Sequence, residues 1–144
     1  SNSSAASDVY KRQIVINSNI FNYINVLDKA ADAAYTRNDI LANNIANDST
    51  PNYKRKDVQF ESLLQASLAG GGKLDDKVEQ LNQNLGDLEG FVYTDHSSLS
   101  YRLDGNNVDI DQEEAYLAEN QIRYQALIDQ MNQEFSRYDV VLKS

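Results

Sequence analysis

The segment that decides the fold is Asp39-Ile-Leu-Ala-Asn-Asn-Ile-Ala-Asn-Asp-Ser-Thr-Pro-Asn-Tyr-Lys-Arg-Lys-Asp57. Its first half places apolar residues on one helical stripe, at Leu41, Ala42, Ile45 and Ala46. Its second half ends a helix, because Asn, Asp and Ser side chains compete for backbone hydrogen bonds and Pro51 cannot continue the ladder. The segment therefore predicts a long helix that stops in a stiff turn, which Tyr53 leaves in a fixed direction.

Three asparagines, Asn43, Asn44 and Asn47, lie close together in this helix, although Asn is a weak helix former. Their amides must gain something, either by capping the helix locally or by contacting a neighbouring segment. The plainer interpretation is a helix end with solvated amides. Thr50 precedes proline and is expected to be extended.

Composition limits the classes of function. The chain has 144 residues, enough for one domain with a modest core, and a formal charge of −9, which argues against general binding of nucleic acid. The basic cluster at 54–56 is a local exception, interpreted as a solvated turn or a subunit contact. The absence of cysteine excludes disulfides and thiolate chemistry. We expect neither a membrane-spanning helix nor a cleaved signal peptide, because no suitable apolar run is present.

The N-terminal part of the chain predicts a long helix over 17–48, capped by Asn17, Ser18 or Asn19. Residues 1–13 lack its apolar period and are interpreted as an added, adaptor-derived tail, with the natural start near 14–16. Steps of four and three residues define a heptad seam with one polar position. The seam consists of Ile20, Ile24, Leu27, Ala31, Ala34, Asn38, Leu41 and Ile45.

A second long helix is predicted over 111–142, opened by an approximate capping box of Asp111 and Glu114. Its seam has the same steps: Leu117, Gln121, Tyr124, Ile128, Met131, Phe135, Tyr138 and Leu142. Apolar residues outside both seams are expected to be buried between subunits. They are Phe21, Val26, Ile40, Ile122 and Leu127.

The middle of the chain predicts smaller elements: a short helix over 57–69, a flexible glycine loop at 70–72, a helix over 73–89 that contains Gly86 and ends at Gly90, and extended segments with one tight turn over 91–110. The predicted fold class is mainly α. Two long terminal helices pair as an antiparallel, coiled-coil-like hairpin in one structural domain, with segments 14–60, 61–98 and 99–144.

The chemistry that an enzyme needs is missing from the sequence. His96 is a single histidine in a predicted loop, no metal-ligand spacing of His and Cys occurs, and the glycine loop lacks the residues that follow a phosphate-binding loop. The acidic cluster of Asp109, Asp111, Glu113 and Glu114 does not match a calcium loop and is explained by the helix dipole. We therefore expect no catalytic residue, cofactor, metal or small-molecule substrate.

Two stretches resemble a known family. Residues 41–47 followed by 49–53 resemble the N-terminal signature of bacterial flagellar axial proteins, which are rod, hook and hook-associated subunits. Residues 104–111, 113, 117–120 and 124–127 resemble the C-terminal region of proximal rod subunits, most closely the FlgB type. The resemblance marks the following residues as family-motif or subunit-interface positions: Leu41, Ala42, Asn43, Asn44, Ile45, Ala46, Asn47, Thr50, Pro51, Tyr53, Asp104, Gly105, Asn106, Val108, Asp109, Asp111, Glu113, Leu117, Asn120, Tyr124 and Leu127.

The resemblance implies a structural subunit of the flagellar basal-body rod, the helically assembled drive shaft that transmits torque from the membrane ring to the hook. The implied partners are copies of the chain, other rod subunits, membrane-ring and rod-adaptor proteins, and the type III export apparatus, which such subunits pass without a cleaved signal. Segment 61–98 carries no family motif, so another axial subunit, of the rod or hook, is one alternative. An acidic coiled-coil adaptor or chaperone is another.

Overall fold

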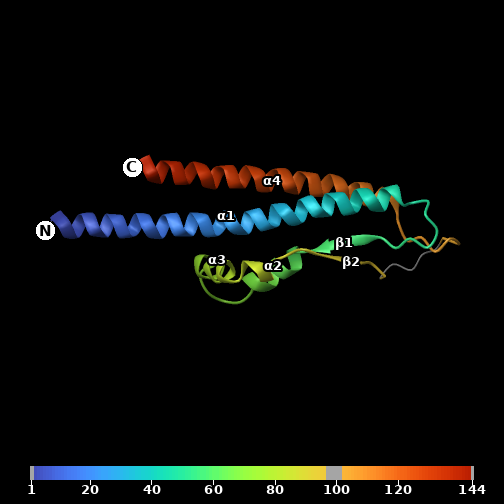
Figure 1. Cartoon of the computed structure of the whole chain (residues 1–144), viewed down its shortest axis with the longest axis horizontal. Coiled ribbons are helices and arrows are strands. Elements are labelled where there is room, and N and C mark those ends of the chain that lie inside the picture. Colours follow the sequence, from blue (N-terminus) through green and yellow to red (C-terminus); the bar gives the residue numbers. More distant parts are fainter. Residues whose placement is uncertain (1, 97–101, 144) are drawn as a thin grey trace.

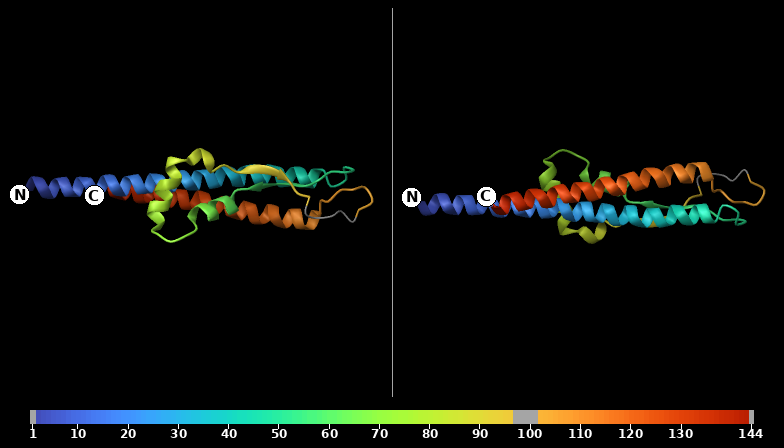
Figure 2. Two further views of the ribbon diagram at one scale, coloured as in Figure 1. Left: turned by 90° about the horizontal axis from the view of Figure 1, so that it is seen from below. Right: turned by 90° about the horizontal axis from the view of Figure 1, so that it is seen from above.

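Two long helices that run antiparallel to each other dominate the fold, α1 (Asn2–Ala46) and α4 (Ile110–Lys143). The computed structural model describes residues 2–96 and 102–143. Both chain ends lie at the same end of the molecule, and α1 and α4 stay side by side in all views (Figures 1 and 2). The prediction of a mainly helical chain whose long terminal helices pack together is confirmed.

The start of α1 differs from the prediction. The helix begins at Asn2, so the expected cap at Asn17, Ser18 or Asn19 is wrong. Residues 3–13 contain neither Gly nor Pro, and an established helix extends through such a sequence one hydrogen bond at a time. Residues 3–12 are exposed, and this first part of α1 projects beyond the end of α4 (Figure 1).

Residues 56–94, which lie between α1 and α4 in the sequence, form a second layer, which we call the β–α layer. It contains β1 (Lys56–Gln59), α2 (Glu61–Leu68), α3 (Leu74–Gln83), the 3-10 turn η1 (Leu85–Asp87) and β2 (Phe91–Thr94). The two strands pair antiparallel, with Lys56 opposite Thr94 and Gln59 opposite Phe91. The pairing of β1 with β2 thereby joins the two segments that enclose α2, α3 and η1.

Two predicted boundaries in this layer are wrong. The helix expected from residue 57 begins at Glu61, because residues 56–59 pair with β2 instead. The helix expected over 73–89 ends at Gln83, and Gly86 lies in the 3-10 turn that follows. The extended segment expected after residue 90 begins with β2, while its part over 97–101 lies outside the described residues.

The seam predicted on α1 faces the interior. Ile20, Ile24, Ala31, Ala34 and Leu41 are buried. Leu27, Asn38 and Ile45 are half-buried. The Asn38 Oδ1 atom is buried and has no hydrogen-bond donor among the described residues, which carries an energetic cost that an apolar side chain would avoid.

The observed seam on α4 shares every second residue with the predicted seam and differs at the residues between them. The inward-facing residues, again at steps of four and three, are Glu113, Leu117, Asn120, Tyr124, Leu127, Met131, Glu134, Tyr138 and Val141. Three of them are polar and fully or almost fully buried, Glu113, Asn120 and Glu134. The predicted seam residues Gln121, Phe135 and Leu142 are exposed, Ile128 is half-buried, and Leu127 packs inward rather than outward.

The choice of these inward-facing positions on α4 has a physical reason. Asn120 Nδ2 donates to the Ala34 carbonyl at 2.7 Å, and Glu134 accepts from Arg137 Nη1 at 3.0 Å. Glu113 is buried against Arg55 and Asn44. These partners offset much of the cost of burying polar groups, although Asn120 Oδ1 is buried with no donor among the described residues. The helix can therefore face inward on its polar positions and leave larger apolar side chains outside.

The β–α layer covers one face of the helix pair. On α1 it contacts Lys29, which pairs with Glu89 at 3.5 Å, and Ala33, which packs with Phe60 and Leu88. On α4, Arg123 Nη1 lies 2.8 Å from Glu61 Oε2. In the right-hand view of Figure 2 the long helices lie in front with the layer behind them, so none of the described elements covers the opposite face of the pair.

Aromatic and aliphatic residues line this uncovered face. Each follows an inward-facing position by one residue, and they are seven or fourteen residues apart, which keeps them on one side of each helix. The Phe21 ring lies 5.0 Å from that of Tyr138, and the Tyr35 ring 6.4 Å from that of Tyr124, so both rings of α1 lie beside the seam of α4. We call this set the open face: Phe21, Tyr35, Ile128, Phe135 and Leu142.

Leu41 provides a test of the helix pairing, since its side chain is 0% exposed. Leu41→Ala should lower the free energy of unfolding by about 2–5 kcal/mol, because it removes buried apolar surface and leaves a cavity. Leu74→Ala is the matched control, because Leu74 is exposed at the start of α3. Urea unfolding followed by circular dichroism measures both, and equal losses in the two variants would contradict this packing.

Candidate functional site: a buried polar junction

The candidate site is a junction where the end of α1, the start of β1 and the start of α4 meet. Asn44 is at its centre and is 0% exposed. Its Nδ2 donates to the Lys56 carbonyl at 2.7 Å and to Glu113 Oε2 at 3.0 Å. Its Oδ1 accepts from the Lys56 amide at 2.9 Å and from the Tyr53 hydroxyl at 3.1 Å. One side chain thus replaces a strand neighbour for β1 and joins α1 to α4.

Arg55 is the second element of the junction. Its Nε donates to Glu113, its Nη1 to Asp95 Oδ2 at 2.8 Å and its Nη2 to Asp57 Oδ2 at 3.0 Å. Its backbone amide donates to Asn107 Oδ1 at 2.6 Å. The guanidinium therefore binds carboxylates from β1, from the residue after β2 and from α4, in the forked geometry that arginine favours.

Arg37 extends this network to α1. Its Nε and Nη2 atoms lie 2.8 and 3.3 Å from the two carboxylate oxygens of Asp57. Both guanidinium groups also lie over the Tyr116 ring, at 5.5 Å for Arg37 and 5.6 Å for Arg55. Two arginines thus pair with three carboxylates, and the Tyr116 ring in the first turns of α4 contacts both guanidinium groups.

The protonation of the network follows from these contacts. Burial alone would lower the pKa of Arg55, but hydrogen bonds to Glu113, Asp57 and Asp95 outweigh it and raise the pKa. Burial would raise the pKa of Asp57, but Arg37, the Val58 amide and Arg55 lower it below its ordinary value of 3.8. The stability that Asp57 contributes is therefore present above its unfolded-state pKa and is lost as the pH falls through the lowered value.

The turn after α1 is held by a second buried asparagine. Asn106 Nδ2 donates to the carbonyls of Asn47 at 2.8 Å, Asp48 at 3.0 Å and Thr50 at 2.8 Å. Its Oδ1 accepts from the Val108 amide at 2.7 Å. These carbonyls belong to the turn that follows α1, so Asn106, which precedes α4, holds that turn against the start of the second long helix. Asp109 caps α4 itself, accepting from the Gln112 amide at 3.2 Å, so the predicted capping box of Asp111 and Glu114 is wrong.

Beyond the junction lies the tip turn, residues 102–105. The Asn52 amide donates to the Asp104 carbonyl at 2.7 Å, and Lys54 Nζ contacts the Gly105 carbonyl. Arg102 pairs with Asp48 at 2.8 Å and with Asp104 at 3.1 Å. Gly105 has a φ of 75°, and a Cβ atom there would lie 2.6 Å from Asn52 Oδ1, so this close approach requires glycine.

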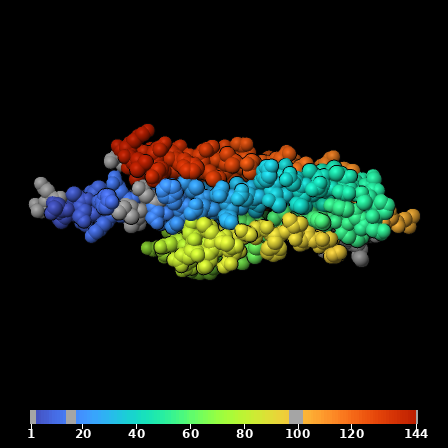
Figure 3. Space-filling model, viewed as in Figure 1, coloured from blue at the N-terminus to red at the C-terminus, as the bar shows by residue number. Residues whose placement is uncertain are grey.

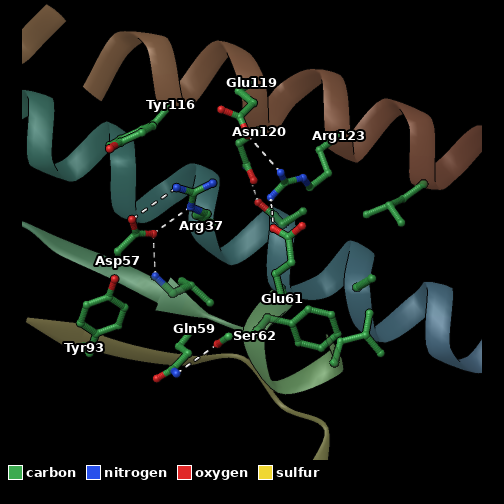
Figure 4. Close-up of a pocket in the computed structure, with 17 residues that line it drawn as sticks. Arg37, Asp57, Gln59, Glu61, Ser62, Tyr93, Tyr116, Glu119, Asn120 and Arg123 are labelled. Carbon is green, nitrogen blue, oxygen red and sulfur yellow. Dashed lines mark hydrogen bonds and ion pairs between the residues drawn. The ribbon is translucent and has the colours of Figure 1, made fainter. Parts of the chain in front are cut away.

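Next to the junction, a groove of about 690 Å³ opens between α1, α4 and the β–α layer (Figure 4). Its floor consists of Ala30, Ala33 and Ala34, small residues that leave room above them. Phe60, Leu64 and Leu127 add apolar walls, and Arg37 with Asp57 closes the end nearest the junction. Figure 4 shows Arg123 between Glu119 and Glu61 at the edge of the groove.

The structure brings together only part of the predicted site. Asn44, Tyr53 and Glu113 meet directly in the junction, and Asn47, Thr50 and Asn106 meet at the end of α1. The remaining predicted residues do not form a single site. Leu41, Val108 and Asn120 are buried, Ile45, Asp104, Gly105, Leu117, Tyr124 and Leu127 are half-buried, and Ala42, Asn43, Ala46, Pro51, Asp109 and Asp111 are exposed.

Sequence reasoning missed the charged core of the junction. Arg55 belongs to a cluster interpreted as a solvated turn or a subunit contact, yet it is buried, and Arg37, Asp57 and Asp95 were not singled out. One signal was present: Glu113 lies four residues before Leu117 and so continues the α4 seam. A carboxylate at a seam position requires a cationic or amide partner.

Comparison with known proteins gives a consistent result. No family model matches the chain. The flagellar basal body rod protein FlgB of Bacillus subtilis is 37% identical over 117 residues, which cover 81% of this chain and 89% of that protein. The chain belongs to the FlgB family of flagellar basal-body rod proteins.

FlgB proteins of other bacteria are also similar to this chain over most of its length. The FlgB protein of Borreliella burgdorferi is 32% identical over 78% of this chain and 89% of its own length. That of Escherichia coli K12 is 30% identical over 75% of this chain and 83% of its own length. No helix in the described part of the chain contains a stretch apolar enough to cross a membrane.

Replacement of Glu113 tests the junction. Glu113→Gln should lower the free energy of unfolding by about 2–4 kcal/mol, because it removes a buried charge that pairs with Arg55. Glu114→Gln, at the exposed neighbouring position, should change it by less than about 0.5 kcal/mol. Chemical denaturation at neutral pH measures both, and a Glu113→Gln chain as stable as its control would show that the junction is unimportant.

Gly105→Ala tests the tip turn. The substitution should cost about 1–3 kcal/mol, because alanine is strained at this φ and its Cβ meets Asn52. Gly71→Ala is the control, since a Cβ there meets nothing within 4 Å. Thermal unfolding compares them, and similar melting temperatures would refute the role assigned to Gly105.

Proposed function

We propose that this chain is a structural subunit of the bacterial flagellar basal-body rod that assembles by burying its open face against the long helices of neighbouring subunits. The observation that carries this proposal is the exposed apolar stripe along α1 and α4. Phe135 is 46% exposed, Leu142 59% and Tyr35 61%, although each lies on a helix whose other side is well packed.

The shape and period of the open face favour a helix as its partner. Its residues recur at intervals of seven along α4 and are fourteen residues apart on α1, where Asp28 lies between Phe21 and Tyr35. Such a stripe fits the side chains of another long helix, whereas a small ligand requires a concave site. Each large apolar side chain that becomes fully buried contributes about 1.5–3 kcal/mol, so leaving the face in water is unfavourable.

A mechanical role fits the rest of the molecule. Helix α4 has 34 residues and spans about 51 Å, and α1 is longer. Force along or around such a pair passes through packed side chains and the buried junction, without a chemical step. The carboxylates of the described residues form no group of three suited to a metal ion, and those of the junction pair with arginines.

We extend the proposal to the partners and the route of assembly. Copies of the chain and other rod subunits would cover the open face, and the chain would transmit torque between the membrane ring and the hook. Export in an unfolded state, without a cleaved signal, suits a chain that has no disulfide to reduce. Figure 3 shows the β–α layer beneath only part of the helix pair, so much of both helices is available to neighbours.

Phe135→Asp tests this assembly surface. A charge on the open face should abolish entry into rods, and therefore motility, because it cannot be buried against an apolar neighbour. The isolated chain should unfold within about 0.5 kcal/mol of the parent, because Phe135 is exposed in it. Gln133→Asp, exposed on the same helix, is the control and should restore motility to cells that lack the chromosomal gene.

Two outcomes would contradict the proposal. Cells that carry Phe135→Asp could swim as well as those that carry Gln133→Asp, which would show that the open face is not buried in the rod. The unmodified chain could also fail to restore rods in those cells, which would refute its function as a rod subunit.

A further inference from the structure

Leu103 is an apolar residue at an unusual position. It is 109% exposed, although its neighbours in the tip turn are firmly held. Gly105 N donates to the Arg102 carbonyl at 3.1 Å, and the Asp104 carbonyl accepts from the Asn52 amide at 2.7 Å. The backbone of the turn is therefore held in place, so little backbone entropy would be lost when the leucine is buried by a partner.

The groove next to the junction can accept such a side chain. Its alanine floor and its walls of Phe60, Leu64 and Leu127 are apolar, and its volume of about 690 Å³ exceeds that of one leucine side chain. The Arg123 ion pairs at its edge join side chains that are more than one third exposed, with Glu61 60% and Glu119 59% exposed. Such exposed pairs contribute little and can rearrange when a partner binds.

The charges beside the two surfaces are complementary. Next to the tip turn are Lys54, which contacts the Gly105 carbonyl, and the exposed Lys56, whereas Arg102 within the turn is paired with Asp48 and Asp104. The edge of the groove carries Glu61 and Glu119 with one arginine. The two lysines are therefore attracted to the glutamates at this edge, which would orient the leucine toward the groove.

The leucine and the groove cannot meet within one chain. The tip turn lies at one end of the molecule, beyond the end of α1, whereas the groove lies beside the β1–α2 connection (Figure 1). The contacts of Asp48, Asn52 and Lys54 keep the turn at that end. The occupant must come from another molecule.

We propose that Leu103 of one copy of this chain inserts into the groove of a second copy, floored by Ala30, Ala33 and Ala34. The inference rests on the proposed function, since it names one contact between rod subunits. Because the knob and the groove are different surfaces, the contact is heterologous, and its repetition extends a filament instead of closing a symmetric dimer.

Disulfide cross-linking tests this contact, because the chain has no cysteine of its own. Leu103→Cys and Ser62→Cys chains are produced together in cells that lack the chromosomal gene, and one of them carries a mass tag. Ser62 is exposed and lines the groove. The control replaces Ser62→Cys by Ser67→Cys, which is exposed on the same helix α2 but does not line the groove. Basal bodies are isolated, oxidised and analysed on a non-reducing gel.

The expected result is about tenfold more mixed dimer from the 103 and 62 pair than from the 103 and 67 pair, since the contact raises the local concentration of the thiols. Equal amounts of mixed dimer in rods that contain all three variants would overturn the inference and leave the rod function intact. Failure of the unmodified chain to enter rods would refute the proposed function instead. Exclusion of only Leu103→Cys chains that fold like the parent would support the contact.

Discussion

The structure depends on the buried contact of Arg55 and Asn44 with Glu113. Glu113 is 1% exposed, so its charge is stable there only while these partners are in place. Asn44 comes from the end of α1, Arg55 from the turn and Glu113 from the start of α4. A shift of α4 along α1 would separate them and leave an unpaired charge in the interior. The network therefore specifies one alignment of two helices whose apolar side chains alone would permit several.

The same constraint determines which surface remains outside. With Glu113 facing inward, the period of the helix also turns Asn120 and Glu134 inward, where Ala34 and Arg137 provide partners. Phe135 and Leu142 then lie on the outer face of the pair, opposite the β–α layer. In a monomer this arrangement is unfavourable, because apolar groups stay in water while polar groups are buried. In an assembly it is reasonable, since the polar seam fixes the subunit and the apolar face is left available to neighbours.

The sequence predicted the two long helices well, because apolar steps of four and three that continue over about 30 residues are typical of a long helix and of no other regular structure. It also located the turn after α1, where Pro51 and the asparagines allow little else. It could not predict which α4 stripe is buried, because that depends on partners of Glu113 and Asn120 that lie 58 and 86 residues away in the chain. Strand β1 was missed for a similar reason: its four residues pair with β2, and only that pairing distinguishes them from the first turn of a helix. Arg55 was grouped with its basic neighbours because its carboxylate partners could not be recognised. Glu113 and Asp95 are distant in sequence, and Asp57 belongs to a strand that was not expected.

The proposed assembly surface is exposed in the isolated subunit and should be buried in the rod. Alkylation of a Gln121→Cys chain measures this burial, because Gln121 is an exposed polar residue seven positions before Ile128 on the same stripe. The cysteine should be labelled rapidly in the purified chain and be strongly protected in isolated basal bodies. Equally rapid labelling in both would show that this face stays exposed in the rod.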